Sequence, residues 1–268
     1  MNSIYETAGI TKQAFHSHMK RELKTMEEEQ QLIPIIREIR EEHPVMSAKQ
    51  IYQLIQPVTM GRDLFMEFCF REGFKVEQKR SFHRTTNSLG VTRFENLLIG
   101  LELIGINQVW VSDITYYRIG ETFYYITLIM DLFSRYIVGH SVSDNLMTEH
   151  TTIPTLKMSL KDRKPAPGLI FHSDGGGQYY CKEFLKITNK YKVKNSMCAS
   201  VYENANAERL NGIIKNDYLV HYNPQDGKQL EKQVVRAKNN YNEIRLHSAL
   251  GGQSPAQFEF PFLKAKNY

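Results

Sequence analysis

Three apolar, β-branched runs follow one another closely in the second half of the chain, at residues 109–116, 123–130 and 135–142. Runs of this length and composition are typical of β-strands. The segment Arg118 to Thr122 between the first two runs contains Gly120 and favours a hairpin turn. Because the third run also follows after a short connection, the pattern predicts an antiparallel meander of three strands. This meander limits the fold more than any other feature of the chain.

The same half of the chain continues as an alternation of helices and strands. Helical periodicity covers residues 148–160, 180–191 and 205–218, and the short runs at 169–173 and 194–198 are strand-like. A meander followed by alternating helices and strands is the element order of a ribonuclease-H-like core. The predicted fold class is therefore α/β over residues 104–268, with a mixed five-stranded sheet and flanking helices.

The first 74 residues show helical periodicity and no strand pattern. Ser47 followed by Gln50 is a capping-box signature for one helix, and a second helix is expected from about Gly61. Two short helices joined by a tight turn are typical of a helix-turn-helix, but a small three-helix bundle without DNA contact has the same pattern. We predict an all-α, helix-turn-helix-like region over residues 1–74, with both interpretations open.

Residues 75–103 differ from both neighbouring regions. Lys79, Arg80 and Arg84 are mixed with Ser, Thr and Asn, and no strand or helix period is present. The composition predicts a basic linker arm whose cations bind DNA phosphates, although a solvated linker has the same composition. The balance of 34 Lys and Arg against 29 Asp and Glu favours a polyanionic partner without requiring one.

Cysteine usage and hydropathy exclude several classes of protein. Cys69, Cys181 and Cys198 form neither a CxxC pair nor a zinc-ligand spacing, which is typical of free thiols in a reducing compartment. The longest apolar run, residues 123–130, is too short to span a bilayer, and the N-terminus lacks the layout of a signal peptide. We expect a cytoplasmic protein without a membrane partner.

Three acidic residues occupy positions that surface exposure explains poorly. Asp113 lies within the first strand run, Asp174 follows a short apolar run, and Glu208 lies near the start of a helix. Each alone has a plainer explanation, as a turn cap, as the start of a glycine turn or as a solvated helix position. Together, three carboxylates from three elements suit a Mg²⁺ site for phosphoryl transfer, because Mg²⁺ prefers oxygen ligands. Metal chemistry predicts that these side chains converge.

The helix expected at residues 205–218 is amphipathic. At 100° per residue, one face carries Glu208, Asn211, Gly212 and Lys215, and the opposite face carries Leu210, Ile213 and Ile214. We expect the apolar face to pack and the other face to carry function. Glu208 would then point to a metal ion, and Lys215 would reach a phosphate from the same side.

At these positions the sequence resembles the integrase-core transposases of bacterial insertion sequences, specifically the OrfB subunit of the insertion sequence three family. NQVWVSDITYY is similar to that family's first-Asp motif and HSDGGGQYYCKEF to its second-Asp motif. NANAERLNGIIKNDY is similar to its Glu helix, and YNEIRLHSALGGQSPAQF to its C-terminal signature. The resemblance covers residues 107–258, and the helical segment resembles the region that usually precedes the core.

The resemblance implies a retroviral-integrase-like core in which Asp113, Asp174 and Glu208 are the catalytic, metal-binding triad. It implies two Mg²⁺ ions, for which Mn²⁺ substitutes. Lys215 matches the basic residue that follows the Glu by two turns and is assigned to DNA binding. Three further residues match motif positions near the site and are also assigned to DNA: Gln178, Asn204 and Arg209. Asp131, Arg135, Arg245 and His247 match positions that are assigned to holding the structure together.

Two departures from the family pattern stand out. Gly175 occupies a position where the second-Asp motif commonly has a basic residue, which alters a phosphate contact. Asp174 and Glu208 are separated by 33 residues, two fewer than is typical of the family. The gap falls near residues 199–202, in an expected loop, so the triad should survive.

The predicted function is that of a DNA transposase, which cleaves the 3′ ends of an insertion sequence and transfers the strands. The expected partners are DNA, an upstream OrfA-type subunit or fusion, and further copies of the chain on DNA, at the nucleoid of a bacterial cytoplasm. Two alternatives stay open: a non-catalytic DNA-binding regulatory or remnant product, and a ribonuclease-H-type nuclease. The C-terminal signature argues against the nuclease.

Overall fold

The structure is a computed structural model that describes residues 5, 9–76, 93–198 and 204–264. The chain divides into two compact units, Met1–Gln78 and Lys79–Tyr268, each with its own hydrophobic core. No helix within the described ranges is long and apolar enough to cross a membrane. The predicted arm residues Lys79, Arg80 and Arg84 lie outside the described residues.

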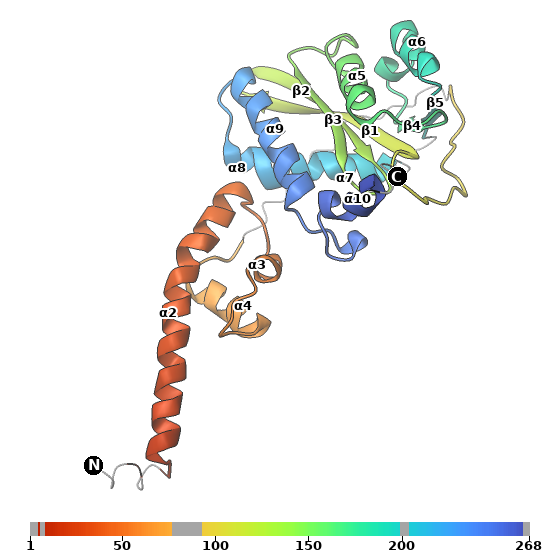
Figure 1. The fold of residues 1–268 in the computed structure, drawn as a ribbon. Coiled ribbons are helices and arrows are strands. Elements are labelled where there is room, and N and C mark those ends of the chain that lie inside the picture. Colours follow the sequence, from red (N-terminus) through yellow and green to blue (C-terminus); the bar gives the residue numbers. More distant parts are fainter. Residues whose placement is uncertain (1–4, 6–8, 77–92, 199–203, 265–268) are drawn as a thin grey trace. The chain divides into compact units, whose positions relative to one another are not determined.

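The first unit is all-α, as predicted. Helix α2 (Lys12–Glu42) is long, and α3 (Ala48–Ile55) packs with α4 (Arg62–Arg71) (Figure 1). Apolar side chains from all three helices form one core, including Ile36, Ile51 and Phe65. Pro34 lies inside α2 without ending it.

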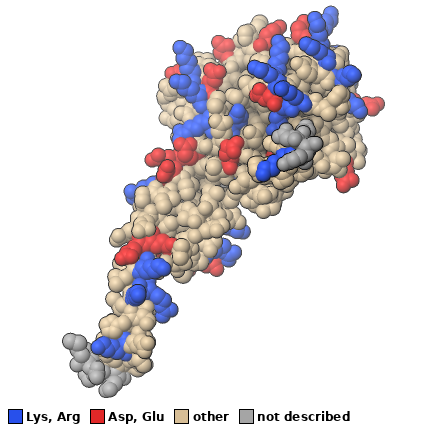
Figure 2. Space-filling view, viewed as in Figure 1, with Lys and Arg blue, Asp and Glu red and all other residues tan. Residues whose placement is uncertain are grey.

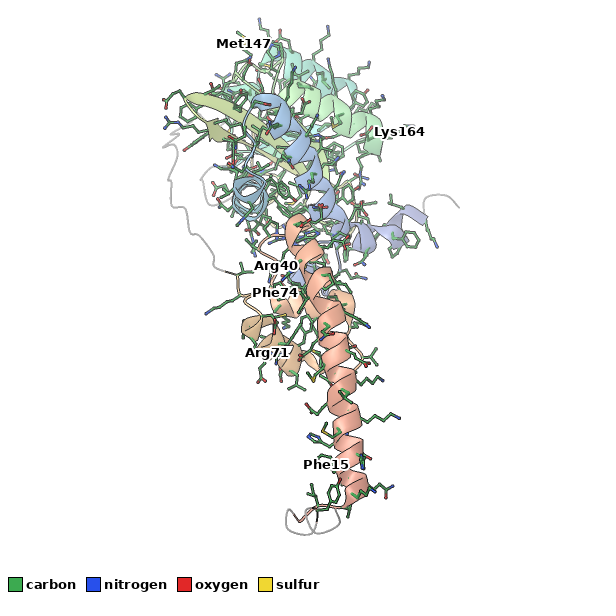
Figure 3. All side chains as sticks on the ribbon, turned by 90° about the vertical axis from the view of Figure 1, so that its left-hand side faces the viewer. Phe15, Arg40, Arg71, Phe74, Met147 and Lys164 are labelled. Carbon is green, nitrogen blue, oxygen red and sulfur yellow. The ribbon has the colours of Figure 1, made fainter. Side chains whose placement is uncertain are left out.

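Polar side chains define the turns of this unit. Ser47 and Gln50 form the predicted capping box at the start of α3. Arg40, near the end of α2, donates to the carbonyl oxygens of Met46 and Phe74, with a distance of 2.9 Å to the second (Figure 3). Arg40 thus ties α2 to the segments that precede α3 and follow α4.

Charge is unevenly distributed over the helical unit. Exposed basic side chains gather along the N-terminal part of α2, at Lys12, Lys20, Arg21 and Lys24 (Figure 2). The arginines of α4 are instead paired with acids, Arg62 with Asp63 at 2.8 Å and Arg71 with Glu29 at 2.7 Å. The second helix of the helix-turn-helix-like pair therefore offers little free positive charge to DNA.

The second unit is built on a mixed five-stranded sheet in the order β3-β2-β1-β4-β5. Strand β1 (Val109–Ile119) pairs antiparallel with β2 (Thr122–Asp131), which pairs antiparallel with β3 (Ile137–Ser143). Strand β4 (Ile170–Ser173) joins β1 in parallel, and β5 (Lys194–Met197) joins β4 in parallel. The predicted meander and mixed sheet are confirmed.

Helices cover both faces of this sheet. Helices α5 (Thr152–Arg163) and α6 (Lys182–Lys190) pack on one face, and α9 (Gly227–Glu243) packs on the other together with the helical run after residue 204 (Figure 1). Alternate residues of β1 divide between the two cores. Trp110 belongs to the core of α5 and α6, whereas Val109 and Val111 belong to the other. This division follows from the two-residue period of a strand.

The predicted helix over residues 205–218 is α-helical only at its start. Helix α7 (Ala205–Ile213) continues as a π-helical segment, η3 (Ile214–Leu219), and then as α8 (Val220–Tyr222). The buried residues of α7 are Ala207, Leu210 and Asn211. The predicted division into a polar and an apolar face is therefore wrong at Asn211. A π-helical segment changes the angular spacing of side chains, and such segments are frequent at functional sites.

The last elements, η4 (Ser248–Leu250) and α10 (Pro255–Lys264), complete the second unit. Glu259 of α10 is only 1% exposed and forms an ion pair with Arg163 of α5 at 2.6 Å. Ser134, between β2 and β3, donates to the same carboxylate at 2.6 Å. These contacts attach the C-terminal helix to two segments that are distant in the sequence.

Candidate active site

Strand register brings Asp113 and Asp174 to the same level of the sheet. Strands β1 and β4 are parallel, and Ser112 lies opposite Ser173 in their ladder. Asp113 is the next residue of β1, and Asp174 is the first residue after β4. The two carboxylates therefore come from adjacent strands at corresponding positions.

Two hydrogen bonds hold the Asp113 carboxylate. Oδ2 accepts from Nδ2 of Asn211 in α7, and Oδ1 accepts from the backbone N–H of Ile114, both at 2.9 Å. Burial and, next, the negative charge of Asp174 raise the pKa of Asp113 to about 7, against the opposite effect of the two hydrogen bonds. Ionised Asp113 is thus unfavourable unless a cation balances its charge.

Glu208 approaches the same region from α7. It lies in the first turn of that helix and is exposed. Partial burial, followed by the charge of Asp174, raises the pKa of Glu208. Asp174 therefore acts electrostatically on both other carboxylates, and the three predicted residues share one region of the molecule.

The three carboxylates do not form a closed ligand set. Among the residues that the structure describes, no three His, Cys, Asp or Glu side chains form a group that could hold a metal ion. Both aspartates instead accept hydrogen bonds from the protein itself. Asp174 Oδ1 accepts from the backbone N–H of Gly176 at 3.0 Å, and Asp113 accepts from the side chain of Asn211. The structural elements converge as predicted, whereas the carboxylate oxygens do not.

The chemistry of this donor set fits a hard divalent cation. All three side chains offer oxygen ligands, which Mg²⁺ prefers. Their mutual repulsion and the raised pKa of Asp113 mean that a bound cation would relieve an unfavourable charge distribution. Asp174 and Glu208 are exposed, so a phosphate can approach them from solvent.

Lys215 lies against β1 just beyond Asp113. Its Nζ donates to Thr115 Oγ1 at 3.3 Å and lies 4.7 Å from the centre of the Tyr116 ring. Burial lowers the pKa of Lys215, and the charge of Asp113 opposes this shift. Lys215 belongs to η3, so the π-helical segment, and not a regular α-helix, sets its direction.

The other residues predicted to position DNA differ in exposure. Arg209 is exposed on α7. Gln178, in the short helix η1 (Gly177–Tyr179), donates through Nε2 to the carbonyl oxygen of Leu146 at 3.3 Å. Asn204 is only 2% exposed and donates to the carbonyl oxygen of Ser112 at 3.3 Å. Asn204 thus holds the start of α7 on β1, and its assignment to DNA stays a prediction.

Several predicted structural residues surround the site. Asp131 accepts two backbone N–H bonds in the connection after β2. Arg135 adopts a positive φ of 64° and donates to Asn206 Oδ1 of α7 at 2.5 Å. Arg245 forms an ion pair with Asp217 of η3 at 2.8 Å. Both arginines thus tie other segments to the helical run that carries Glu208.

Gly175 occupies a position that no other residue fits without rearrangement. Its φ is +81°, and a Cβ atom there would lie 2.6 Å from Sδ of Met197 in β5. The positive φ favours glycine, whereas the flexible end of the Met197 side chain can shift to relieve the close approach. The basic residue expected from the family pattern would therefore be strained in the loop that follows Asp174.

Asn211 was placed on the helix face expected to carry function, but no sequence motif assigned it a specific role. It is 5% exposed and its amide contacts Asp113. Its spacing indicated that it lies near Glu208, because Asn211 follows Glu208 by three residues and so lies about one helical turn away. Burial of its side chain against β1 could not be inferred from the helix alone.

For the activity predicted from the sequence, Asn211→Ala should slow DNA cleavage by about 10- to 100-fold, because partners that orient metal-binding carboxylates typically have effects of this size. The measurement is the cleavage rate as a function of Mg²⁺ concentration, and the variant should need more Mg²⁺. Asn189→Ala, at an exposed position of α6, is the control. Equal rates for the two variants would contradict a role for Asn211.

Comparison with known proteins identifies the family of the chain. Residues 105–202 match the family described as Integrase core domain, and residues 189–255 match a second family of that description. The insertion element IS600 uncharacterized 31 kDa protein of Shigella sonnei is 33% identical over 213 residues, which cover 75% of each chain. Transposase InsF for insertion sequence IS3A of Escherichia coli (strain K12) is 32% identical over 201 residues, which cover 70% of this chain and 67% of that relative.

A solved structure shows the same fold. It is the simian T-cell lymphotropic virus intasome in complex with PP2A regulatory subunit B56 gamma. One of its chains matches 59% of this chain and 57% of its own length, with 18% identity and a TM-score of 0.50. Sequence relatives, fold and motif positions agree, and the chain belongs to the insertion sequence IS3 family of DDE transposases.

Proposed function

We propose that this transposase cleaves the 3′ ends of an insertion sequence and joins them to target DNA, with Asp113, Asp174 and Glu208 holding two Mg²⁺ ions. Mn²⁺ is expected to substitute. The observation that carries the proposal is the placement of Asp113 and Asp174 at corresponding positions of adjacent parallel strands, with Glu208 on the helix whose Asn211 contacts Asp113. As a transposase, the chain is a polynucleotidyl transferase of DNA recombination.

The chemistry is an in-line displacement at phosphorus, performed twice. Water first breaks the phosphodiester bond at the element end and releases a DNA 3′-hydroxyl. That hydroxyl then attacks a target phosphodiester, forms the new P–O bond and displaces the target 3′-oxygen. Bound Mg²⁺ would supply charge stabilisation at the attacking and leaving oxygens. Asn211 orients Asp113, and Lys215 offers a cation to a phosphate of the substrate.

We further propose that two or more copies act together on DNA, because two element ends must be joined to one target. An upstream OrfA-type subunit or fusion would select those ends. The expected place of action is the nucleoid of a bacterial cytoplasm. An assay that omits the upstream subunit therefore tests the catalytic site and not the selection of ends.

The proposal is tested by cleavage and strand transfer on labelled DNA that carries the native element ends, with Mg²⁺. Three proteins are compared, each with and without the upstream subunit: the unchanged chain, Glu208→Gln and Glu183→Gln. Glu183 is the matched control because it is also an exposed first-turn glutamate, on α6. Glu208→Gln should lose activity by at least about 10³-fold, whereas Glu183→Gln should keep it.

The outcomes separate the competing functions. If Glu208→Gln loses activity while the unchanged chain and Glu183→Gln keep it, the result supports the carboxylate site. Activity that survives in Glu208→Gln refutes its role as a ligand. Absence of activity in every mixture, including Mn²⁺ reactions, would refute a catalytic function and favour a regulatory or remnant product.

A further inference from the structure

We propose that Arg93 is a phosphate-binding residue of the loop that carries Asp174, and that it contacts DNA beside the carboxylate site. This inference rests on the proposed function and adds a residue to it. Arg93 belongs to the described end of the basic arm, just before the sheet begins. The sequence analysis predicts phosphate contact for the arm as a whole, and the new element is the place of Arg93 beside the loop that carries Asp174.

The loop after Asp174 provides no cation of its own. Residues 174–178 are Asp, Gly, Gly, Gly and Gln. A basic side chain at Gly175 would be strained, because the φ of that residue is +81°. Positive charge for a phosphate near Asp174 must therefore come from bound Mg²⁺ or from a side chain outside this loop.

Backbone contacts bring Arg93 to the strand that supports this loop. The backbone N–H of Arg93 donates to Sδ of Met197 at 3.5 Å, and Met197 is the residue that packs on Gly175. The N–H of Met197 donates to the carbonyl oxygen of Glu95 at 3.4 Å. The N–H of Leu97 donates to Ser196 Oγ at 3.0 Å. Residues 93–97 thus run beside β5 and deliver Arg93 to the glycine loop.

An aromatic ring then fixes the guanidinium group. The Cζ atom of Arg93 lies 4.4 Å from the centre of the Tyr180 ring. Tyr180 closes the glycine loop. Its N–H donates to the carbonyl oxygen of Gly177, and its hydroxyl would lie 3.7 Å from a Cβ atom built on Gly177. A guanidinium stacked on a ring keeps its N–H edge available for a phosphate.

The surroundings of Arg93 in the described part of the second unit also suit a phosphate. Arg93 is exposed, and no ion pair joins it to an acid among residues 93–198 and 204–264. Arg118 offers the contrast: it too lies over a ring, that of Phe123 at 5.6 Å, but it is paired with Glu121 at 2.8 Å. Stacking without a carboxylate partner is what a phosphate-binding arginine requires.

The test measures binding of the full chain to a labelled duplex with the element end, without divalent cation, over a range of NaCl concentrations. Arg93→Gln should weaken binding about fivefold and reduce the slope of log K against log salt by about 1, as expected for one lost phosphate contact. Arg118→Gln, the matched stacked arginine, should leave both unchanged. Tyr180→Phe should keep binding, and Tyr180→Leu should weaken it like Arg93→Gln.

Strand joining by the unchanged chain is measured on the same DNA. If that chain binds and joins DNA but Arg93→Gln behaves like Arg118→Gln, the role of Arg93 is refuted while the proposed function stands. If the unchanged chain neither binds nor joins DNA, the proposed function fails and this inference fails with it. Thermal unfolding of each variant confirms that a loss of binding does not reflect a loss of folding.

Discussion

Asp113→Asn should abolish DNA cleavage and, at neutral pH, make the second unit more stable. The loss of activity should be at least about 10³-fold, because an amide is a poor replacement for a carboxylate ligand. The gain in stability should be roughly 1–3 kcal/mol, because burial and Asp174 make the ionised carboxylate unfavourable. Such opposition between activity and stability is common at active sites.

The stability effect has a definite pH dependence. The pKa of Asp113 is about 7 in the folded protein against an ordinary value of 3.8. Between these values the folded protein holds a proton that the unfolded chain lacks, so stability falls as pH rises. Asparagine does not ionise. The advantage of Asp113→Asn should therefore be greatest above pH 7 and disappear below about pH 4.

Trp110 provides the measurement, because it is the single tryptophan of the chain and is fully buried in the second unit. Its fluorescence follows urea unfolding of that unit at several pH values. Asp144→Asn, at an exposed position, is the control. Millimolar Mg²⁺ should stabilise the unchanged chain but not Asp113→Asn. Equal stability of Asp113→Asn and the unchanged chain at pH 8 would contradict the unfavourable charge.

Arg163→Ala should lower the free energy of unfolding of the second unit by about 3–5 kcal/mol, because it leaves the carboxylate of Glu259 buried without its cation. Arg163 is 11% exposed and Glu259 is 1% exposed, and their two hydrogen bonds measure 2.7 and 2.6 Å. The pair anchors α10 to the end of α5. Urea unfolding followed by Trp110 fluorescence is again the measurement.

The exposed pair of Arg118 and Glu121 gives the matched control. These side chains are 53% and 94% exposed, and an exposed pair contributes about 0–1 kcal/mol. Arg118→Ala should therefore change stability little. Replacing both Arg163 and Glu259 by apolar residues should cost less than Arg163→Ala, since no buried charge remains. Similar losses for Arg163→Ala and Arg118→Ala would show that burial does not govern this pair.

The element types could be predicted from sequence because short-range physics determines them. The strand runs of the meander, the turn at Gly120 and the capping box of Ser47 depend on residues within a few positions of one another. The order of these elements then predicts a ribonuclease-H-like fold. The three acidic residues were identified from their sequence motifs and from their positions at apolar runs and at a helix start, namely Asp113, Asp174 and Glu208. Helix ends were less accurate, since α5 begins at Thr152 and not at residue 148.

Contacts between segments that are distant in the sequence decided how the site residues are held. The burial of Asn204 and Asn211 depends on how α7 lies on β1, and it gave each of them a hydrogen bond to that strand. The positive φ that favours glycine at residue 175 occurs in a loop that packs against Met197 of another strand. The sequence by itself determined the fold class and the candidate carboxylates, because local patterns encode them. Only the tertiary structure decided how those carboxylates are held, because packing partners far apart in the chain carry no local signal.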